Sequence, residues 1–187
     1  MADQTQPNPM DQALAASAAN DTAKAIELFS QACELAPSDP VPHFLLGAEL
    51  AQAGRHSDAE LAYAGAVALA PGFAIARYEL GTLQFLMSRI TVALVTWQPL
   101  LELPNGDPLK LFVQGFGCLT QSQPEQAIDY FRKGIEANTT NAALNANIRR
   151  LIERIESTPV PTSAPGGDGN AEASHVLLGA YRRQETP

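Results

Sequence analysis

The chain has 187 residues, of which 45% are hydrophobic and 17% are charged, a composition that suits one domain of ordinary size. Twenty acidic residues against twelve basic ones give a formal net charge of -8, which disfavours nucleic acid and anionic membrane surfaces as partners and favours a basic protein partner. The start of the sequence has no pattern of a secretory signal, and no apolar run approaches the roughly 18 residues that span a bilayer, so we expect a cytoplasmic protein.

The first forty residues contain one clear helical pattern. Residues 1–8 are polar, include two prolines and are expected to be disordered. Asp21 can cap a helix that begins near Thr22 and closes at Pro37, with apolar residues on one stripe. The stretch before it, MDQALAASAA, is a weaker helical pattern.

Two amphipathic helical patterns meet at Gly54. The first covers residues 42–52 and the second about 56–69. Glycine adopts a left-handed backbone without steric cost, so Gly54 is expected to end the first helix.

Two further pairs of helices follow. The first pair is expected over about 74–87 and 90–103, where Pro99 inside the second helix predicts a kink or an early end. The next pair lies within residues 108–140, and Pro124 is expected at the first position of its second helix, where proline is tolerated.

The sequence after residue 140 has three parts. Residues 141–156 form a helical pattern with apolar residues on one face and arginines on the other, which suits a terminal helix covering its neighbour. Residues 157–174 have the composition of a flexible linker. Residues 175–184 form a short amphipathic segment, the tail peptide, with Val176, Leu177, Leu178, Tyr181, Arg182 and Arg183.

Side chains of one kind recur every 34 residues, the interval that separates Gly47 from Gly81. A fixed period of this length is typical of stacked repeat units. The recurring positions are Gly47, Gly81 and Gly115; Ala25, Ala59, Ala93 and Ala127; and Phe29, Tyr63, Trp97 and Phe131. The pattern resembles tetratricopeptide repeats, which are helix-turn-helix units of about 34 residues with a Leu-Gly pair, an aromatic, two small residues and a Pro at set places. The second unit fits best, with Leu46, Gly47, Gly54, Ala59, Tyr63, Ala66 and Pro71.

This resemblance implies an all-α fold, an α-solenoid of stacked helix-turn-helix units with a capping helix. The expected repeat domain covers residues 9–156, with units over about 9–39, 40–73, 74–107 and 108–140 and the cap over 141–156. The first helices of such units line a concave face where partners generally dock. Its predicted lining is Phe44, Tyr78, Phe85, Phe112, Phe116 and Leu119.

Two interpretations of these rings are open, because they either form an apolar binding groove or pack between neighbouring helices. The carboxylate clamp that some members of the family use is not expected, since its places hold residues such as Phe44, Ala48 and Val113 instead of Lys, Asn and Arg. The groove should therefore take an apolar or amphipathic segment of a client. The tail peptide is one such segment in cis, because the 17 linker residues 158–174 reach roughly 20 to 25 Å. Two alternatives to this docking of the tail peptide stay open: the tail is disordered, or it binds another molecule.

Catalytic and metal-binding patterns are weak in this sequence. The adjacent residues His56, Ser57 and Asp58 cannot face one another on a helix as a catalytic triad requires. No histidine or cysteine has metal-ligand spacing, and Cys33 and Cys118 are expected to be small buried thiols. We predict no enzymatic activity, no cofactor and no metal. The sequence indicates a protein interaction module, an adaptor or chaperone; the alternative is a scaffold that assembles through its end cap or tail, and the oligomeric state is open.

Overall fold

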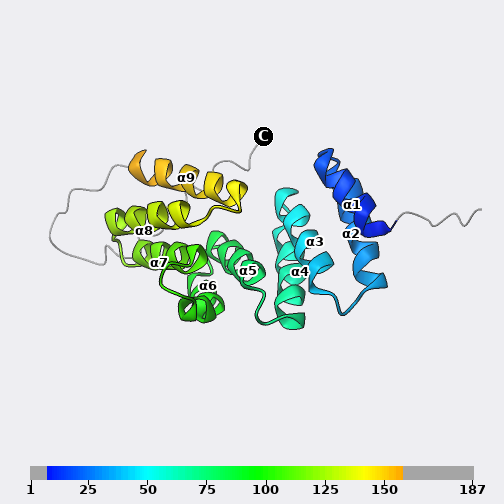
Figure 1. The fold of residues 1–187 in the computed structure, drawn as a ribbon, viewed down its shortest axis with the longest axis horizontal. Coiled ribbons are helices and arrows are strands. Elements are labelled where there is room, and N and C mark those ends of the chain that lie inside the picture. Colours follow the sequence, from blue (N-terminus) through cyan, green and yellow to red (C-terminus); the bar gives the residue numbers. More distant parts are fainter. Residues whose placement is uncertain (1–7, 158–187) are drawn as a thin grey trace, which may run out of the picture. The chain divides into compact units, whose positions relative to one another are not determined.

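The computed structural model describes residues 8–157, and within that range it contains α-helices and one 3-10 helix but no strand. This confirms the predicted all-α class (Figure 1). The described chain divides into two compact units, residues 8–83 and 84–157, which are treated separately below.

The first unit consists of two complete helical pairs and most of a fifth helix. Its elements are α1 (Pro9–Ala18), α2 (Thr22–Leu35), α3 (Pro40–Gln52), α4 (His56–Leu69) and the first part of α5 (Ala74–Leu86). The members of each pair pack on each other, and α2 also packs on α3. The weak pattern at the start of the chain is thus a helix, whose small side chains Ala13 and Ala16 are buried against α2.

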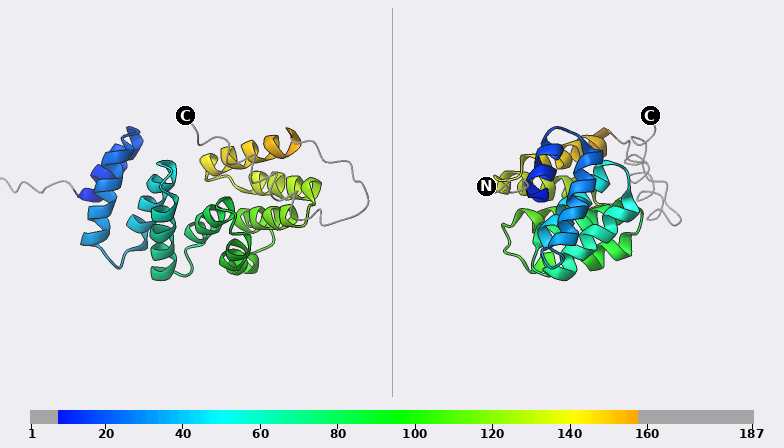
Figure 2. Two further views of the ribbon diagram at one scale, coloured as in Figure 1. Left: turned by 180° about the vertical axis from the view of Figure 1, so that it is seen from behind. Right: turned by 90° about the vertical axis from the view of Figure 1, so that its right-hand side faces the viewer.

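The second unit contains the end of α5 and a stack of helices, which the left view of Figure 2 shows from behind. Its elements are α6 (Ile90–Trp97), η1 (Gln98–Glu102), α7 (Pro108–Thr120), α8 (Pro124–Ala137) and α9 (Ala142–Ser157). Helix α7 packs against α8 and η1, and α8 packs against α9.

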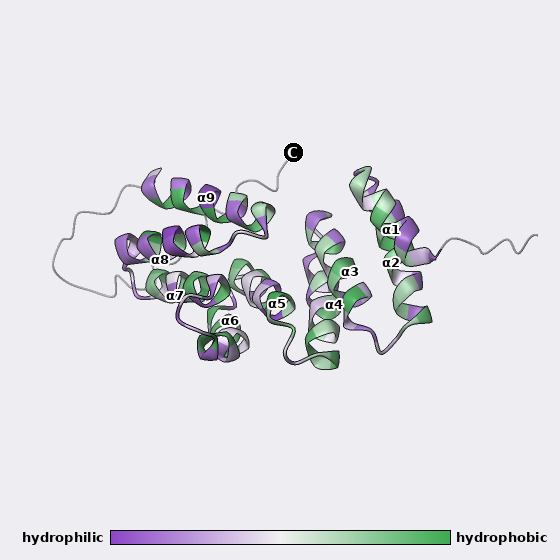
Figure 3. Cartoon of the chain, in the orientation of Figure 1, coloured by the Kyte–Doolittle hydropathy of each residue, from purple (hydrophilic) through white to green (hydrophobic). Residues whose placement is uncertain are grey.

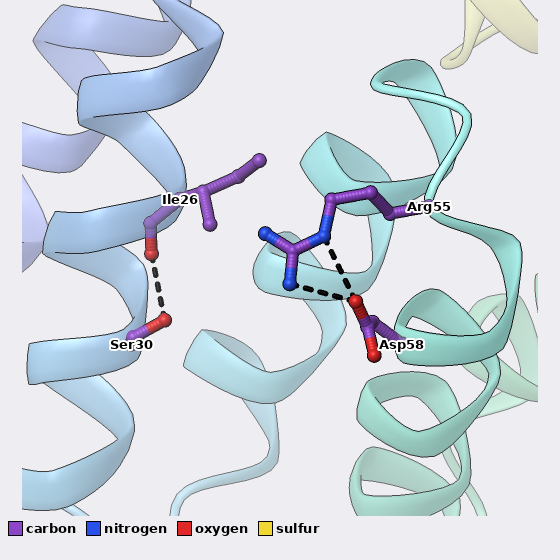
Figure 4. Close-up of polar contacts among 4 residues, drawn as sticks. All are labelled: Ile26, Ser30, Arg55 and Asp58. Carbon is purple, nitrogen blue, oxygen red and sulfur yellow. Dashed lines mark hydrogen bonds and ion pairs between the residues drawn. The ribbon is translucent and has the colours of Figure 1, made fainter.

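Most helices begin at a side chain that binds the exposed backbone N–H groups of the first turn. The predicted cap Asp21 is confirmed, since its carboxylate accepts a hydrogen bond of 3.2 Å from the Lys24 amide. Helix α4 lacks such a cap; there the Arg55 guanidinium pairs with Asp58 at 2.7 Å (Figure 4). Both side chains are about half exposed, so this pair adds little stability, on the order of 0–1 kcal/mol.

The four turns inside the helical pairs share one backbone conformation at the same place in the repeat. Residues Asn20, Gly54, Ser88 and Ser122, each one repeat interval apart, have φ between 57° and 73°. A left-handed residue after a helix lets the next amide bond back to the last turn, as the Arg55 amide does to the Leu50 carbonyl at 2.9 Å. The predicted role of Gly54 is confirmed, and three turns adopt the same geometry without glycine.

The repeated glycine of the first helices makes room for the repeated aromatic ring of the second helices. A Cβ atom added at Gly47 would lie 2.6 Å from the Tyr63 ring, and one added at Gly115 would lie 2.5 Å from the Phe131 ring. Real Cβ atoms do not approach so closely, so each glycine is required by close packing of the helical pair.

Helix α6 ends early, as Pro99 predicted. The α-helix stops at Trp97 and continues as the 3-10 helix η1, in which Pro99 needs no N–H partner. The Lys110 ammonium of α7 then donates to the Leu103 carbonyl and to Asn105 Oδ1, each at 2.9 Å. These bonds hold the connection to α7 in place.

Helix α9 covers α8 with its apolar face. The side chains of Leu144, Ile148, Ile152 and Ile155 are buried, and Arg149 and Arg150 are exposed. Two buried asparagines bond the helices together, because Asn138 Nδ2 donates to Asn145 Oδ1 and Asn145 Nδ2 donates to the Asn138 carbonyl, both at 2.8 Å.

Candidate interaction surfaces

Most of the side chains predicted to line a groove are buried. Tyr78, Phe85, Phe112, Phe116 and Leu119 are all less than 9% exposed, and Phe44 is half-buried. The two interpretations left open by the sequence therefore separate: packing accounts for five of the six, and only Phe44 is partly accessible to a partner. Whether any of the six takes part in binding stays a prediction.

The second unit shows why these rings are buried. Phe116 lies 4.9 Å from Trp97 and 5.2 Å from Phe131, and Phe85 lies 5.1 Å from Phe116, measured between ring centroids. Phe112 packs on Gly134 of α8, where an added Cβ would lie 2.4 Å from its ring. These rings form the core between α7 and its neighbours.

In the first unit, four side chains occupy matching repeat positions on the first helices, and we call them the α1–α3 face. They are Met10 and Leu14 on α1 and, one repeat later, Phe44 and Ala48 on α3. Leu14 is 46% exposed and the other three are half-buried. Phe44 is supported from below, since its ring lies 5.1 Å from Phe73 and 5.9 Å from Tyr63.

Polar and apolar contacts join α1 to α3 beside this face. The Ser17 hydroxyl of α1 donates to the buried Glu49 carboxylate of α3. Leu45 and Leu46 of α3 pack against the cluster that contains Ala13 and Ala16. Helices α1 and α3, which carry the α1–α3 face, are thus joined by a side-chain hydrogen bond and by apolar packing.

Net charge differs sharply between the two units. Residues 8–83 contain nine carboxylate side chains and three basic ones, a formal charge of -6, whereas residues 84–157 contain seven of each. The first unit therefore carries most of the charge of -8 of the whole chain. A field of one sign attracts basic partners over a Debye length of about 10 Å at 0.1 M salt.

One carboxyl group of the first unit is in an unfavourable position for its charge. Burial raises the pKa of Glu79 on α5 to about 7, because the ionised form loses its hydration. Burial also raises the pKa of the Tyr63 hydroxyl, and the nearby charge of Glu79 adds to that shift. Near neutral pH, Glu79 is thus divided between its two forms.

An exposed apolar surface lies on α6 and η1 of the second unit, and we call its four residues the α6 face. Val92, Leu94, Val95 and Leu101 are 39%, 39%, 65% and 41% exposed. The opposite side of the same segment is buried through Ala93, Trp97 and Leu100. Figure 3 colours α6 largely in the green of apolar residues, while α8 shows long purple stretches.

The repeat register shows that this surface is peculiar to α6. The positions of Val92 and Val95 are held by Lys24 and Glu27 in α2, by Asp58 and Leu61 in α4, and by Gln126 and Asp129 in α8. Residues 90–101 contain no charged side chain, whereas the other three second helices each contain at least two. The signal for this face in the sequence is the absence of charge at the outward positions of α6, where the matching positions of the other second helices are mostly charged or polar.

No protein-family model matches the sequence, and no curated protein matches it. Solved structures do match. The crystal structure of MamA has 20% sequence identity and a TM-score of 0.59, over 72% of this chain and 81% of that one. A MamA fragment from Desulfovibrio magneticus RS-1 has 14% identity and a TM-score of 0.58, over 95% and 96%. The Cut9-Hcn1 structure has 20% identity and a TM-score of 0.64 over 97% of this chain, which spans only 31% of that chain.

The fold is that of a tetratricopeptide repeat solenoid. The resemblance indicated by the repeat spacing is therefore confirmed for the architecture. At these identities the likeness shows the fold alone.

The remaining reactive side chains of residues 8–157 are dispersed. Cys118 is buried, as predicted, whereas Cys33 is only half-buried; both are free thiols. Burial raises the pKa of both thiols, with a further contribution from Asp39 at Cys33, which lowers their reactivity. Within residues 8–157, no group of three His, Cys, Asp or Glu side chains is placed to hold a metal ion.

Two further predictions concern the whole chain. In the range 8–157, none of the helices has both the length and the apolar character that a membrane crossing requires. The tail peptide, from Val176 to Arg183, and the linker before it lie outside the described residues.

Proposed function

We propose that this chain is a non-enzymatic protein interaction module, an adaptor or chaperone-like protein of the cytoplasm, whose α1–α3 face binds an amphipathic segment of a client. The client segment has apolar anchors and basic flanks. The observation that supports this most strongly is the coincidence, in the first unit, of accessible apolar side chains with a formal charge of -6.

The apolar part of the proposed contact centres on Phe44 and Leu14. Aromatic and large aliphatic side chains that are rigidly supported from below are typical anchors of binding energy. Phe44 has that support from Phe73 and Tyr63, and its ring has few rotamers left to lose on binding.

The electrostatic part of the proposed contact raises the rate of association and discriminates basic from acidic partners. Basic flanks approach a surface of charge -6 faster than neutral or acidic ones, and salt weakens this attraction.

Synthetic amphipathic peptides with identical Leu and Phe anchors but Lys or Glu flanks test this proposal by fluorescence anisotropy. We expect the Lys-flanked peptide to bind at least about tenfold more tightly at low salt, with a difference that shrinks as salt rises. Equal affinities of the two peptides would contradict the proposal.

Substitutions then locate the contact. Leu14→Asp should weaken binding of the Lys-flanked peptide by about tenfold or more because it places a charge among the apolar anchors. Leu61→Asp is the matched control, since Leu61 is 74% exposed on α4 of the same unit and outside the face. An equal loss from both variants would mean that net charge, and not the α1–α3 face, governs binding.

The scaffold alternative makes a different prediction for the same material. A protein that functions by assembly sediments as a stable oligomer without any client, whereas the module proposed here sediments as a monomer that binds peptide. A stable oligomer that also fails to bind either peptide would favour the scaffold.

A further inference from the structure

The α6 face is an unusual surface for a helix at the exterior of a monomer. Its four side chains are each between 39% and 65% exposed, and no charged residue lies between positions 90 and 101. Several exposed large apolar side chains on one short segment without charge commonly mark a site that another segment or molecule covers.

We propose that residues 176–181 of this chain, the apolar part of the tail peptide, cover the α6 face. The sequence pattern alone suggested the groove of the first helices for this peptide, but the rings expected there are mostly buried. The α6 face offers instead an accessible apolar surface in the same unit as the end of α9.

The chemistry of the two surfaces matches along their length. Val176, Leu177, Leu178 and Tyr181 are apolar or aromatic, and they would meet a face without charge, where no ionic group has to be desolvated. Arg182 and Arg183 follow directly in the tail, and the exposed Glu102 ends η1 directly after Leu101. Apolar contacts with an ion pair at one end fix the direction in which the tail peptide runs as well as its position on the α6 face.

The linker is long enough for this contact. In the second unit α9 packs on α8 and α8 on α7, and α6 and η1 both contact α7. Three interaxial distances of about 8–10 Å each separate the first and last members of such a stack by roughly 25–30 Å. The 17-residue linker has an r.m.s. reach of about 20–25 Å and a fully extended length of about 55 Å.

Tethering also favours this occupant over a second copy of the chain. A linker of this length gives the tail peptide an effective concentration near the α6 face on the order of 1 mM. A second copy at micromolar concentration competes at a disadvantage of about 10² to 10³ for the same apolar surface. The tail peptide is therefore the expected occupant in dilute solution.

Methyl NMR on the full chain tests the inference directly. The substitution pair Leu177→Asp and Leu178→Asp removes the apolar character of the tail peptide while leaving every helix of residues 8–157 unchanged. We expect the methyl resonances of Val92, Leu94, Val95 and Leu101 to shift, while Leu14 and Leu61, which are also exposed, keep theirs. Unchanged resonances on the α6 face would overturn the proposal.

The reciprocal variant, Val92→Asp with Val95→Asp, should release the tail. The ¹⁵N heteronuclear NOE of residues 176–181, expected to be raised in the wild type, should fall to the value found in the tail variant. Circular dichroism and the fluorescence of Trp97, which is the single tryptophan and lies on the buried side of α6, show whether the helix is retained.

Two other results would each contradict the inference. Shifts at Leu14 in place of the α6 face would assign the tail peptide to the α1–α3 face. Shifts on the α6 face that fade on dilution would assign that face to a second copy, because a contact within one chain does not depend on concentration. The inference does not rest on the proposed client binding, since it uses another unit and other variants.

Discussion

The two units of this chain are built from the same helical pair but leave different groups at the surface. The first unit has a charge of -6 and partly accessible apolar residues on its first helices; the second is neutral and exposes its apolar residues on α6. The interior positions of the repeat are alike in both, with a glycine in the first helix against a ring in the second. The repeat thus determines the interior, and the outward positions, which are free to vary, differentiate the units.

The largest expected effect concerns the acidic character of the first unit. With its pKa raised to about 7, Glu79 is neutral in the folded protein at pH values where the unfolded chain has already lost the proton. Folding therefore takes up a proton between the usual carboxyl pKa and about 7, and the free energy of unfolding falls as pH rises through that window, by about 3 kcal/mol in total. Glu79→Gln should abolish this fall and stabilise the protein above pH 7.

Urea denaturation followed by circular dichroism at pH 5 and pH 8 measures the difference. The exposed residue Glu34 on α2 supplies the control, because Glu34→Gln should leave the pH dependence of stability in place. A Glu79→Gln protein that loses as much stability between these pH values as the wild type would show that Glu79 is not the cause.

A smaller effect tests whether the shared interior is as tight as the geometry indicates. Gly115→Ala places a Cβ at 2.5 Å from the Phe131 ring, and we expect a loss of about 1–3 kcal/mol in spite of the better helix propensity of alanine. Gly117 lies on the same helix with no atom within 4 Å of an added Cβ, so Gly117→Ala should stabilise by up to about 1 kcal/mol.

Thermal unfolding observed through Trp97 fluorescence reports both variants, since Trp97 stacks on Phe116 in the same unit. Opposite signs for the two glycines are the expected result. A stabilised Gly115→Ala protein would mean that the ring moves aside easily and that the interior of the second unit is loose.

The smallest expected effect concerns the turns, which are alike in both units. Ser88 and Ser122 have φ values of 63° and 57°, a region that L side chains adopt at a cost. Ser88→Gly and Ser122→Gly should each raise the melting temperature slightly, with a gain in the free energy of unfolding of at most about 1 kcal/mol. The gain is small because glycine relieves the backbone strain but also increases the conformational entropy of the unfolded chain. Gly54→Ala should do the reverse, and a stabilised Gly54→Ala chain would argue against strain at these turns.

Much of the architecture was predictable because helix periodicity and the repeat interval can be detected in the sequence directly. Asp21, Gly54, Pro99 and Pro124 each acted where the sequence placed them, at a cap, a turn, an early helix end and a first helical position. The left-handed turns at Asn20 and Ser122 were not predictable in the same way, because neither residue is glycine and only the matched register identifies them.

The surface was harder to predict than the interior. An aromatic residue that recurs once per repeat on the first helices can line a groove or lie in the core. Periodicity does not distinguish these two positions for Tyr78 or Phe112, which are buried. Outward positions such as Val92 and Val95 do not recur at all, so a search for repetition passes over them. The two units therefore differ at outward positions, where the side chains do not follow the repeat.

Hydrogen exchange with the Lys-flanked probe peptide tests most directly the claim that the two units present different surfaces. We expect slowed amide exchange in α1 and α3 on adding the peptide, with α6 and η1 unaffected. Slowed exchange confined to α6 and η1, or equal slowing in both units, would contradict it.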